Sequence, residues 1–212
     1  MSAYSGCPHK MTARRETIID QYRKHIGHFL PKHKQYWSMC AIHVDANGRL
    51  LQGSELDQML SAGLISTDQF HGVDLDPSII SANAEGIPDA HWHLGDMIQN
   101  ITKAMRTGSF LPGIVNCDHI LMPRSGGATY ISRCLQLLSD QEDLILISNL
   151  ILRSPHDDTS CSPEEYVEEL WRHHQFRDAM RRGWQYDDAV YIYGGSGPRS
   201  STVMGTIVFW KG

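Results

Sequence analysis

Carboxylate side chains follow two short apolar runs of the chain, in positions where they could bind a nucleoside. Asp74 comes directly after Phe-His-Gly-Val, with Asp76 two residues further on. An acidic residue at the end of a strand can accept two hydrogen bonds from a ribose diol. Asp96 follows the next apolar run, where a carboxylate can accept from an exocyclic amine such as that of adenine. Met97 beside it offers an apolar surface. These residue types could hold a ribose and a base that carries an exocyclic amine.

A third polar group, Asn116-Cys117-Asp118-His119, stands at the end of a further apolar run. Ligands bind at strand ends in parallel sheets, so Asn116, Asp118 and His119 are the candidate catalytic residues. His119 is the candidate general base. Cys117 could be a nucleophile, although an inert buried cysteine is commoner. Asn116 could equally satisfy loop amides.

Each acidic residue also has a purely structural interpretation. Asp76-Pro77 is a helix-start signal, because an aspartate N-cap is followed by proline in the first turn. Asp74 could share that capping, and Asp96 could cap the next helix. Both interpretations of these residues stay open on the sequence.

The elements that must position these residues alternate between strand and helix patterns. Short apolar runs predict strands at 36–43, 70–75, 91–94, 113–117, 144–152, 189–193 and 202–210. Helical spacing predicts helices at 12–30, 54–62, 76–86, 97–106, 128–138 and 162–180. This alternation predicts one doubly wound α/β sheet of about seven strands with helices on both faces. Its last two strands form an antiparallel hairpin across the turn-rich residues 194–201.

The segment GVDLDPSIISANAEGIPDAHWHLGDM (72–97) resembles class I S-adenosylmethionine-dependent methyltransferases. The resemblance implies a Rossmann-like fold and S-adenosylmethionine as cofactor, with S-adenosylhomocysteine as product. By the same match, Asp74 holds the ribose with Asp76 as a neighbour, and Asp96 and Met97 contact the adenine. The element order from 36 to 212 also resembles the family, including the terminal hairpin.

The sequence departs from the family after the first predicted strand. The family has a glycine-rich turn there, whereas this chain continues as AIHVDANGRLLQG (41–53). Asn47-Gly48 predicts the turn of a small inserted hairpin. Gly53 is the glycine placed like the family's last one, and its missing Cβ would permit close approach of a ligand. The methionine part of the cofactor is then expected near Trp37, Ser38, Cys40 and Gly53.

The predicted activity is methyl transfer to a substrate that the sequence leaves open, either a small molecule or a nucleic acid. Positioning for in-line attack and one base suffice for this chemistry, so no metal is expected. The histidines and cysteines also lack structural-zinc spacing. Two alternatives remain: a non-catalytic methyltransferase-like binding or regulatory module, and another enzyme that uses S-adenosylmethionine.

Composition places the chain among ordinary globular proteins. Its 212 residues are 41% hydrophobic and 20% charged, with apolar runs far shorter than a membrane span. No secretory signal pattern opens the sequence. Five dispersed cysteines predict reduced thiols and a cytoplasmic location: Cys7, Cys40, Cys117, Cys134 and Cys161.

Charge is distributed unevenly along the chain. Residues 1–35 hold seven Lys and Arg against two acidic residues, a net charge of +5, and the remaining 177 residues carry −10. A basic N-terminal helical arm (1–35) on a methyltransferase-like body (36–212) is therefore predicted. The arm is a candidate contact for a phosphate-bearing partner, or simply a solvated helix face.

Overall fold

The computed structural model describes residues 8–39, 41–108, 110–118, 123–153, 160–187, 191–194 and 203–212. The chain forms two compact units, Met1–Asn116 and Cys117–Gly212. The predicted arm packs within the first unit. The predicted boundary between residues 35 and 36 itself stays a prediction.

The N-terminal helical segment consists of α1 (Pro8–Arg14), the π-helical turn η1 (Arg15–Ile19) and α2 (Asp20–His25). It buries Ile18, Ile19 and Tyr22, apolar residues of the predicted helix 12–30. The segment ends at His25 rather than at residue 30. Gly27, which has low helix propensity, follows the end of α2.

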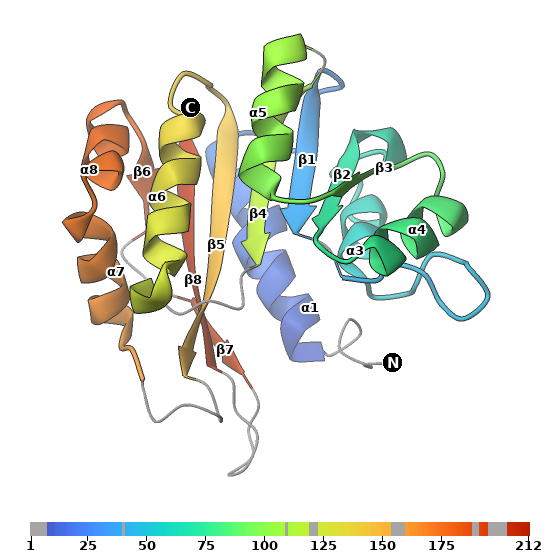
Figure 1. Ribbon diagram of the computed structural model, residues 1–212, viewed down its shortest axis with the longest axis horizontal. Helices are drawn as coiled ribbons and strands as arrows, with labels where there is room; N and C mark the ends of the chain where they lie inside the picture. The colour runs from blue at the N-terminus through green and yellow to red at the C-terminus, as the bar shows by residue number, and fades with distance from the viewer. Residues whose placement is uncertain are drawn as a thin grey trace. The chain divides into compact units, whose positions relative to one another are not determined.

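The first unit contains four parallel strands in the order β3-β2-β1-β4. They are β1 (Lys34–Met39), β2 (Phe70–Asp74), β3 (His91–Leu94) and β4 (Leu111–Asp118), the last belonging to this unit as far as Asn116. Figure 1 shows α5 (Met97–Thr107) on the viewer's side of β1 and β4, and the N-terminal helical segment behind them. The parallel strands with helices on both faces confirm the predicted arrangement.

Side-chain caps fix where the helices of this unit begin. The Ser54 side chain accepts from the Asp57 amide at the start of α3 (Glu55–Ser61), and the Asp76 side chain accepts from the Ser78 amide at the start of α4 (Pro77–Gly86). The Asp96 carboxylate likewise accepts from the Gln99 amide at the start of α5. The capping interpretation of Asp76 and Asp96 is thus confirmed, so both carboxylates are oriented by the backbone they cap.

Residues 41–53, which stand where the resembled family has its glycine-rich turn, are hydrogen-bonded to α4. Val44 and Leu50 form an isolated antiparallel bridge around Gly48, whose φ of +72° suits the predicted turn. Both polar atoms of the buried Asn83 side chain, on α4, form hydrogen bonds with this loop. Its Oδ1 accepts from the His43 amide at 2.7 Å, and its Nδ2 donates to the Ala41 carbonyl at 3.2 Å. The predicted inserted hairpin is confirmed and is anchored on a helix.

Substitution of Gly86 by alanine is expected to lower the free energy of unfolding by about 1–3 kcal/mol. Alanine normally stabilises a helix relative to glycine. At this position, however, a Cβ would lie 2.5 Å from both the Gly48 carbonyl oxygen and Val44 Cγ1. Urea denaturation measures the loss. Gly27→Ala is the control, because a Cβ there meets no atom within 4 Å; equal stability of the two variants would contradict the packing argument.

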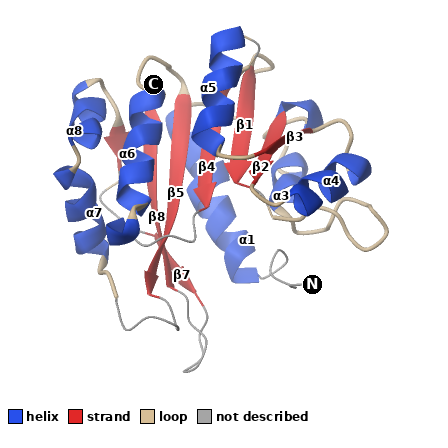
Figure 2. Ribbon diagram, in the orientation of Figure 1, coloured by secondary structure: helices blue, strands red, loops and turns tan. Residues whose placement is uncertain are grey.

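In its described residues, the second unit contains antiparallel strands and three α-helices. Strand β8 (Val203–Lys211) pairs with β5 (Leu144–Arg153), β6 (Gln185–Tyr186) and β7 (Tyr191–Gly194). The helices are α6 (Gly127–Leu137), α7 (Pro163–Arg172) and α8 (His174–Arg181). Figure 2 shows α6 in front of β8 and beside β5. The antiparallel pairing of β7 with β8 confirms the predicted terminal hairpin.

Two features of the second unit differ from the prediction. The capping box of Ser162 and Glu165 starts α7 as expected, but the predicted helix 162–180 breaks at His173, whose backbone is extended (φ −84°, ψ 130°). The two-residue strand β6 is too short for a sequence pattern to reveal. With β6, the described residues contain eight strands, in keeping with the predicted sheet of about seven.

Among the described residues, no helix has both the length and the apolar character needed to cross a membrane.

Candidate functional site

The carboxyl ends of β2 and β3 bring the predicted adenosine-binding residues to one edge. The Gly95 amide donates to the Asp74 carbonyl at 2.9 Å, which joins the two strand ends. Half-buried Asp74 accepts from the Asp76 amide through Oδ1 at 2.8 Å. Half-buried Asp96 accepts from the Gln99 amide at 3.0 Å. Both carboxylates are therefore oriented by the backbone while part of each side chain faces outward.

Asp76 and Met97 differ from these two carboxylates in their surroundings. Asp76 is exposed, and its Oδ1 accepts from the side chain and the backbone amide of Ser78, hydrogen bonds that lower the pKa of Asp76. Met97 is 1% exposed and lies in the core. The structure thus assigns Asp76 to helix capping and Met97 to packing. Their predicted roles toward a ligand stay predictions.

Two large apolar side chains are exposed beside the carboxylates. Leu75, directly after β2, is 78% exposed, and Leu94, at the end of β3, is 56% exposed. Sequence reasoning did not single out either leucine, because each completes an apolar strand pattern. Their positions next to Asp74 and Asp96 are the signal that could have revealed them. Exposed leucines beside half-buried carboxylates suit a ligand with a flat apolar part and a polar part.

A buried charged cluster, which we call the Glu55 cluster, occupies the space between β1, β4 and the start of α3. Glu55 is 4% exposed. The Tyr36 hydroxyl donates to its Oε1 at 2.7 Å, and the Asn116 amide donates to its Oε2 at 3.0 Å. The Arg14 guanidinium, also buried, lies 3.6 Å from Oε2. The carboxylate is therefore enclosed by one cation and neutral donors.

These contacts keep Glu55 ionised and Tyr36 protonated. Burial raises the pKa of Glu55, but the charge of Arg14 and hydrogen bonds from Ser38, Tyr36 and Asn116 together bring it below its ordinary value. Burial and the Glu55 charge both raise the pKa of Tyr36 well above normal. The shared proton consequently stays on the tyrosine oxygen.

Several residues predicted to bind the methionine part lie around the Glu55 cluster. Ser38 is fully buried. Gly53 has a φ of +75°; its amide donates to Asp57 Oδ2 at 2.8 Å, and its carbonyl accepts from Arg14 at 3.4 Å. Asn116, predicted to face a substrate, is 1% exposed and directed at Glu55. Half-buried Asp118 belongs to the second unit. Cys40 and His119 lie outside the described residues.

Trp37 lies elsewhere, in a stack of aromatic rings. It is 0% exposed, and its ring stacks on His71 with centroids 4.3 Å apart. Beyond it, His71 Nδ1 and His93 Nε2 are 2.9 Å apart, and His71 also stacks on His91 at 4.4 Å. The described residues contain no group of three or more His, Cys, Asp or Glu arranged to hold a metal ion.

Burial and neighbouring charge keep His71 and His93 neutral. Burial, followed by the charges of His91 and His93, lowers the pKa of His71 to about 2. Burial, followed by the charges of His91 and Lys103, lowers the pKa of His93 to about 4. Both rings are therefore uncharged at neutral pH, and the stack serves the core of the unit.

Among solved structures, the chain is similar to methyltransferases. An O-methyltransferase from Bacillus cereus in complex with SAH has a TM-score of 0.57 and 11% identity, over 99% of this chain and 84% of that one. A precorrin-6y C5,15-methyltransferase from Geobacter metallireducens GS-15 has a TM-score of 0.51 and 11% identity, over 100% and 94%. A SAM-dependent methyltransferase from Agrobacterium tumefaciens has a TM-score of 0.52 and 13% identity, over 98% and 63%.

No protein-family model and no curated protein matches the chain. At identities of 11–13%, the likeness to solved structures establishes the fold. The Rossmann-like methyltransferase fold expected from residues 72–97 is thereby confirmed.

Proposed function

We propose that the protein binds S-adenosylmethionine and transfers its methyl group to an acceptor. The observation that carries the proposal is the edge formed by β2 and β3, where half-buried Asp74 and Asp96 lie beside exposed Leu75 and Leu94. Adenosine has polar groups that a carboxylate can bind and a flat base that an apolar side chain can cover. The fold shared with an O-methyltransferase solved in complex with SAH and with a SAM-dependent methyltransferase supports the same ligand.

The residues of this edge fit the adenosine half of the cofactor. Asp74 Oδ1 already accepts from the Asp76 amide, so its second oxygen is the one proposed to accept from the ribose hydroxyls. The Asp96 side chain would accept from the adenine amine, and Leu75 and Leu94 would cover the base. When bound, the cofactor supplies a methyl group on a sulfonium centre. The chain's contribution is to hold and orient that cofactor.

The methionine half would lie toward β1 and α3, near the Glu55 cluster. Ser38 and Gly53 are the residues proposed to border it, with Cys40. Asp118 and His119 are the residues proposed to face the acceptor. Methyl transfer needs positioning first and a base only when the acceptor must lose a proton.

S-adenosylhomocysteine is expected to raise the melting temperature of the protein, because a ligand that binds only the native state stabilises it. In Asp74→Ala, the affinity measured by calorimetry is expected to fall at least tenfold, since hydrogen bonds to a charged group contribute about 1.5–3 kcal/mol. The control is Asp89→Ala, an exposed aspartate in the loop before β3. Absence of binding, or equal affinities for the two variants, would refute the adenosine site.

A non-catalytic adenosine-binding module is a second candidate, favoured by the Glu55 cluster. Arg14 is paired with Glu55, and the residues that replace the glycine-rich turn are bound to Asn83. If the methionine half has no site, adenosine and S-adenosylhomocysteine will bind with equal affinity. If the protein is a methyltransferase, S-adenosylhomocysteine will bind more tightly than adenosine.

A further inference from the structure

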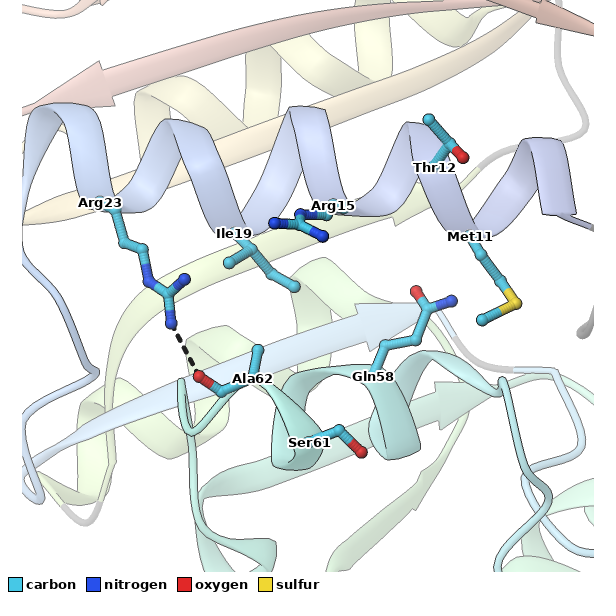
Figure 3. Close-up of a pocket in the computed structure, with 8 residues that line it drawn as sticks. All are labelled: Met11, Thr12, Arg15, Ile19, Arg23, Gln58, Ser61 and Ala62. Carbon is cyan, nitrogen blue, oxygen red and sulfur yellow. Dashed lines mark hydrogen bonds between the residues drawn. The ribbon is translucent and has the colours of Figure 1, made fainter.

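A groove of about 460 Å³ separates the N-terminal helical segment from α3 (Figure 3). Its volume lies within the range of small-molecule sites. Arg15 and Arg23 line one wall, and Gln58 and Ser61 line the other. Met11 and Ile19 add apolar surface. None of these residues belongs to the edge proposed for adenosine, so the groove is a separate feature of the first unit.

The carboxamide of Gln58 has no hydrogen-bond partner among the described residues, although its Nε2 and Oε1 are both buried. Figure 3 shows the side chain pointing from α3 toward the N-terminal helical segment. A buried amide without partners is costly, since its lost hydrogen bonds to water are not replaced. A ligand that presents an acceptor next to a donor would satisfy both atoms at once.

The two arginines of the groove are held differently. Arg23 donates to the Ala62 carbonyl at 2.7 Å and to the His28 carbonyl at 3.4 Å, and thereby ties α2 to the end of α3. Within the described part of the chain, the Arg15 side chain makes no hydrogen bond or ion pair, and the residue is exposed. A guanidinium beside a small-molecule groove favours a phosphate, which it can bind through two parallel hydrogen bonds.

The wall that carries Arg15 has an unusual backbone. Arg15–Ile19 is a π-helical turn, and the Thr17 hydroxyl donates to the Ala13 carbonyl at 2.7 Å. Such turns are rare and occur frequently at functional sites. Glu16 and Asp20 lie on the same segment, but neither lines the groove. The positive charge of Arg15 is therefore presented to the groove without an acidic neighbour in its wall.

We propose that this groove binds a small nucleotide, with the phosphate on Arg15 and the edge of the base on Gln58. The carboxamide offers the donor and acceptor that a base edge complements, as glutamine does with adenine. Met11 and Ile19 would contact the apolar face of the ligand. Arg15 and Arg23 are two of the seven Lys and Arg that give residues 1–35 their net charge of +5.

Calorimetry with uridine 5′-monophosphate tests the proposal, because uracil carries adjacent donors and acceptors and avoids the adenosine site. Arg15→Gln is expected to weaken its binding at least tenfold. Gln58→Leu is expected to weaken it by a similar factor while leaving the weaker binding of inorganic phosphate unchanged. Gln58→Leu removes an unpartnered amide, so the variant is expected to fold at least as stably as the parent protein.

Arg106→Gln, which removes an exposed charge from α5, serves as the matched control and should bind uridine 5′-monophosphate normally. No binding at millimolar ligand, or equal losses in Arg15→Gln and Arg106→Gln, would overturn the proposal. Binding of a single-stranded RNA that neither groove variant weakens would overturn it in favour of a nucleic-acid surface. Titration of S-adenosylhomocysteine into Gln58→Leu should be unchanged, so this test is independent of the proposed methyltransferase function.

Discussion

Replacement of Glu55 by alanine is expected to lower the free energy of unfolding by about 3–5 kcal/mol. The substitution leaves the buried Arg14 guanidinium without its carboxylate, 3.6 Å away in the parent protein. It also removes the acceptor of the Tyr36 hydroxyl and of the Asn116 amide. The unpaired buried charge and the buried donors left without acceptors both destabilise the folded protein. Urea denaturation at neutral pH measures the change.

Two further variants isolate the charge effect. Glu85→Ala removes an exposed carboxylate from α4 and should change stability by less than about 0.5 kcal/mol. The double variant Arg14→Met/Glu55→Met should be more stable than Glu55→Ala, because it leaves no unpaired charge in the core. A loss below about 1 kcal/mol in Glu55→Ala would mean that water reaches Arg14 and that the cluster is not closed.

The pH dependence of this cluster has a defined sign. The pKa of Glu55 is lower in the folded protein than its ordinary value of 4.5. A depressed carboxyl pKa contributes stability that is complete above the unfolded-state pKa and is lost as the pH falls through the folded-state pKa. The Glu55 cluster therefore stabilises the first unit at neutral pH and fails only in acid.

Local signals in the sequence were sufficient to locate most elements. Asp76-Pro77 predicts the start of α4, and Ser162-Pro163-Glu164-Glu165 predicts the start of α7, because the capping atoms lie within three residues of one another. His173 shows the limit of this reasoning. Its extended backbone divides α7 from α8, although no proline or glycine marks the break.

The Glu55 cluster could not be predicted, because its contacts join distant parts of the chain. In the sequence, Glu55 is an ordinary acidic residue in the first turn of a helix. Its partners Tyr36 and Asn116 are 19 and 61 residues away, and only the pairing of β1 with β4 brings them together. The sequence predicts Asn116 at the end of a strand. The direction of its side chain, toward Glu55, depends on the pairing of β1 with β4.

The edge of β2 and β3 was predicted more completely, since parallel strands end at the same side of a sheet. Asp74 is the last residue of β2 and Asp96 stands two residues after the end of β3, so both lie at this edge. The exposure of Leu75 and Leu94 could not be predicted, because an apolar residue at the end of a strand pattern is usually assigned to the core. Trp37, which the sequence predicts near the methionine part of the cofactor, instead joins the histidine stack. It precedes Ser38 on β1, and successive side chains of a strand point to opposite faces.

The stability of the protein is expected to fall already in mild acid, at pH values well above the one at which Glu55 is protonated. His71→Phe should make this loss of stability smaller. The pKa of His71 is about 2, against an ordinary value of 6.5, because the ring is buried and faces His91 and His93. A depressed histidine pKa means that the unfolded chain binds a proton which the folded protein does not. Stability is then complete above pH 6.5 and falls by about 1.4 kcal/mol per pH unit below it.

Between pH 6.5 and 4.5, His71 alone should therefore account for a loss of about 2–3 kcal/mol, and His93 adds to it in the same direction. Phenylalanine at position 71 keeps a flat ring against Trp37 but cannot bind a proton, so the slope of stability against pH should fall by about one proton. His33→Phe, which replaces an exposed histidine, should keep the parent slope. The measurement is urea denaturation at a series of pH values. Identical slopes for His71→Phe and His33→Phe would show that His71 is protonated in the folded protein, and the stack would then have to admit water or a counter-charge.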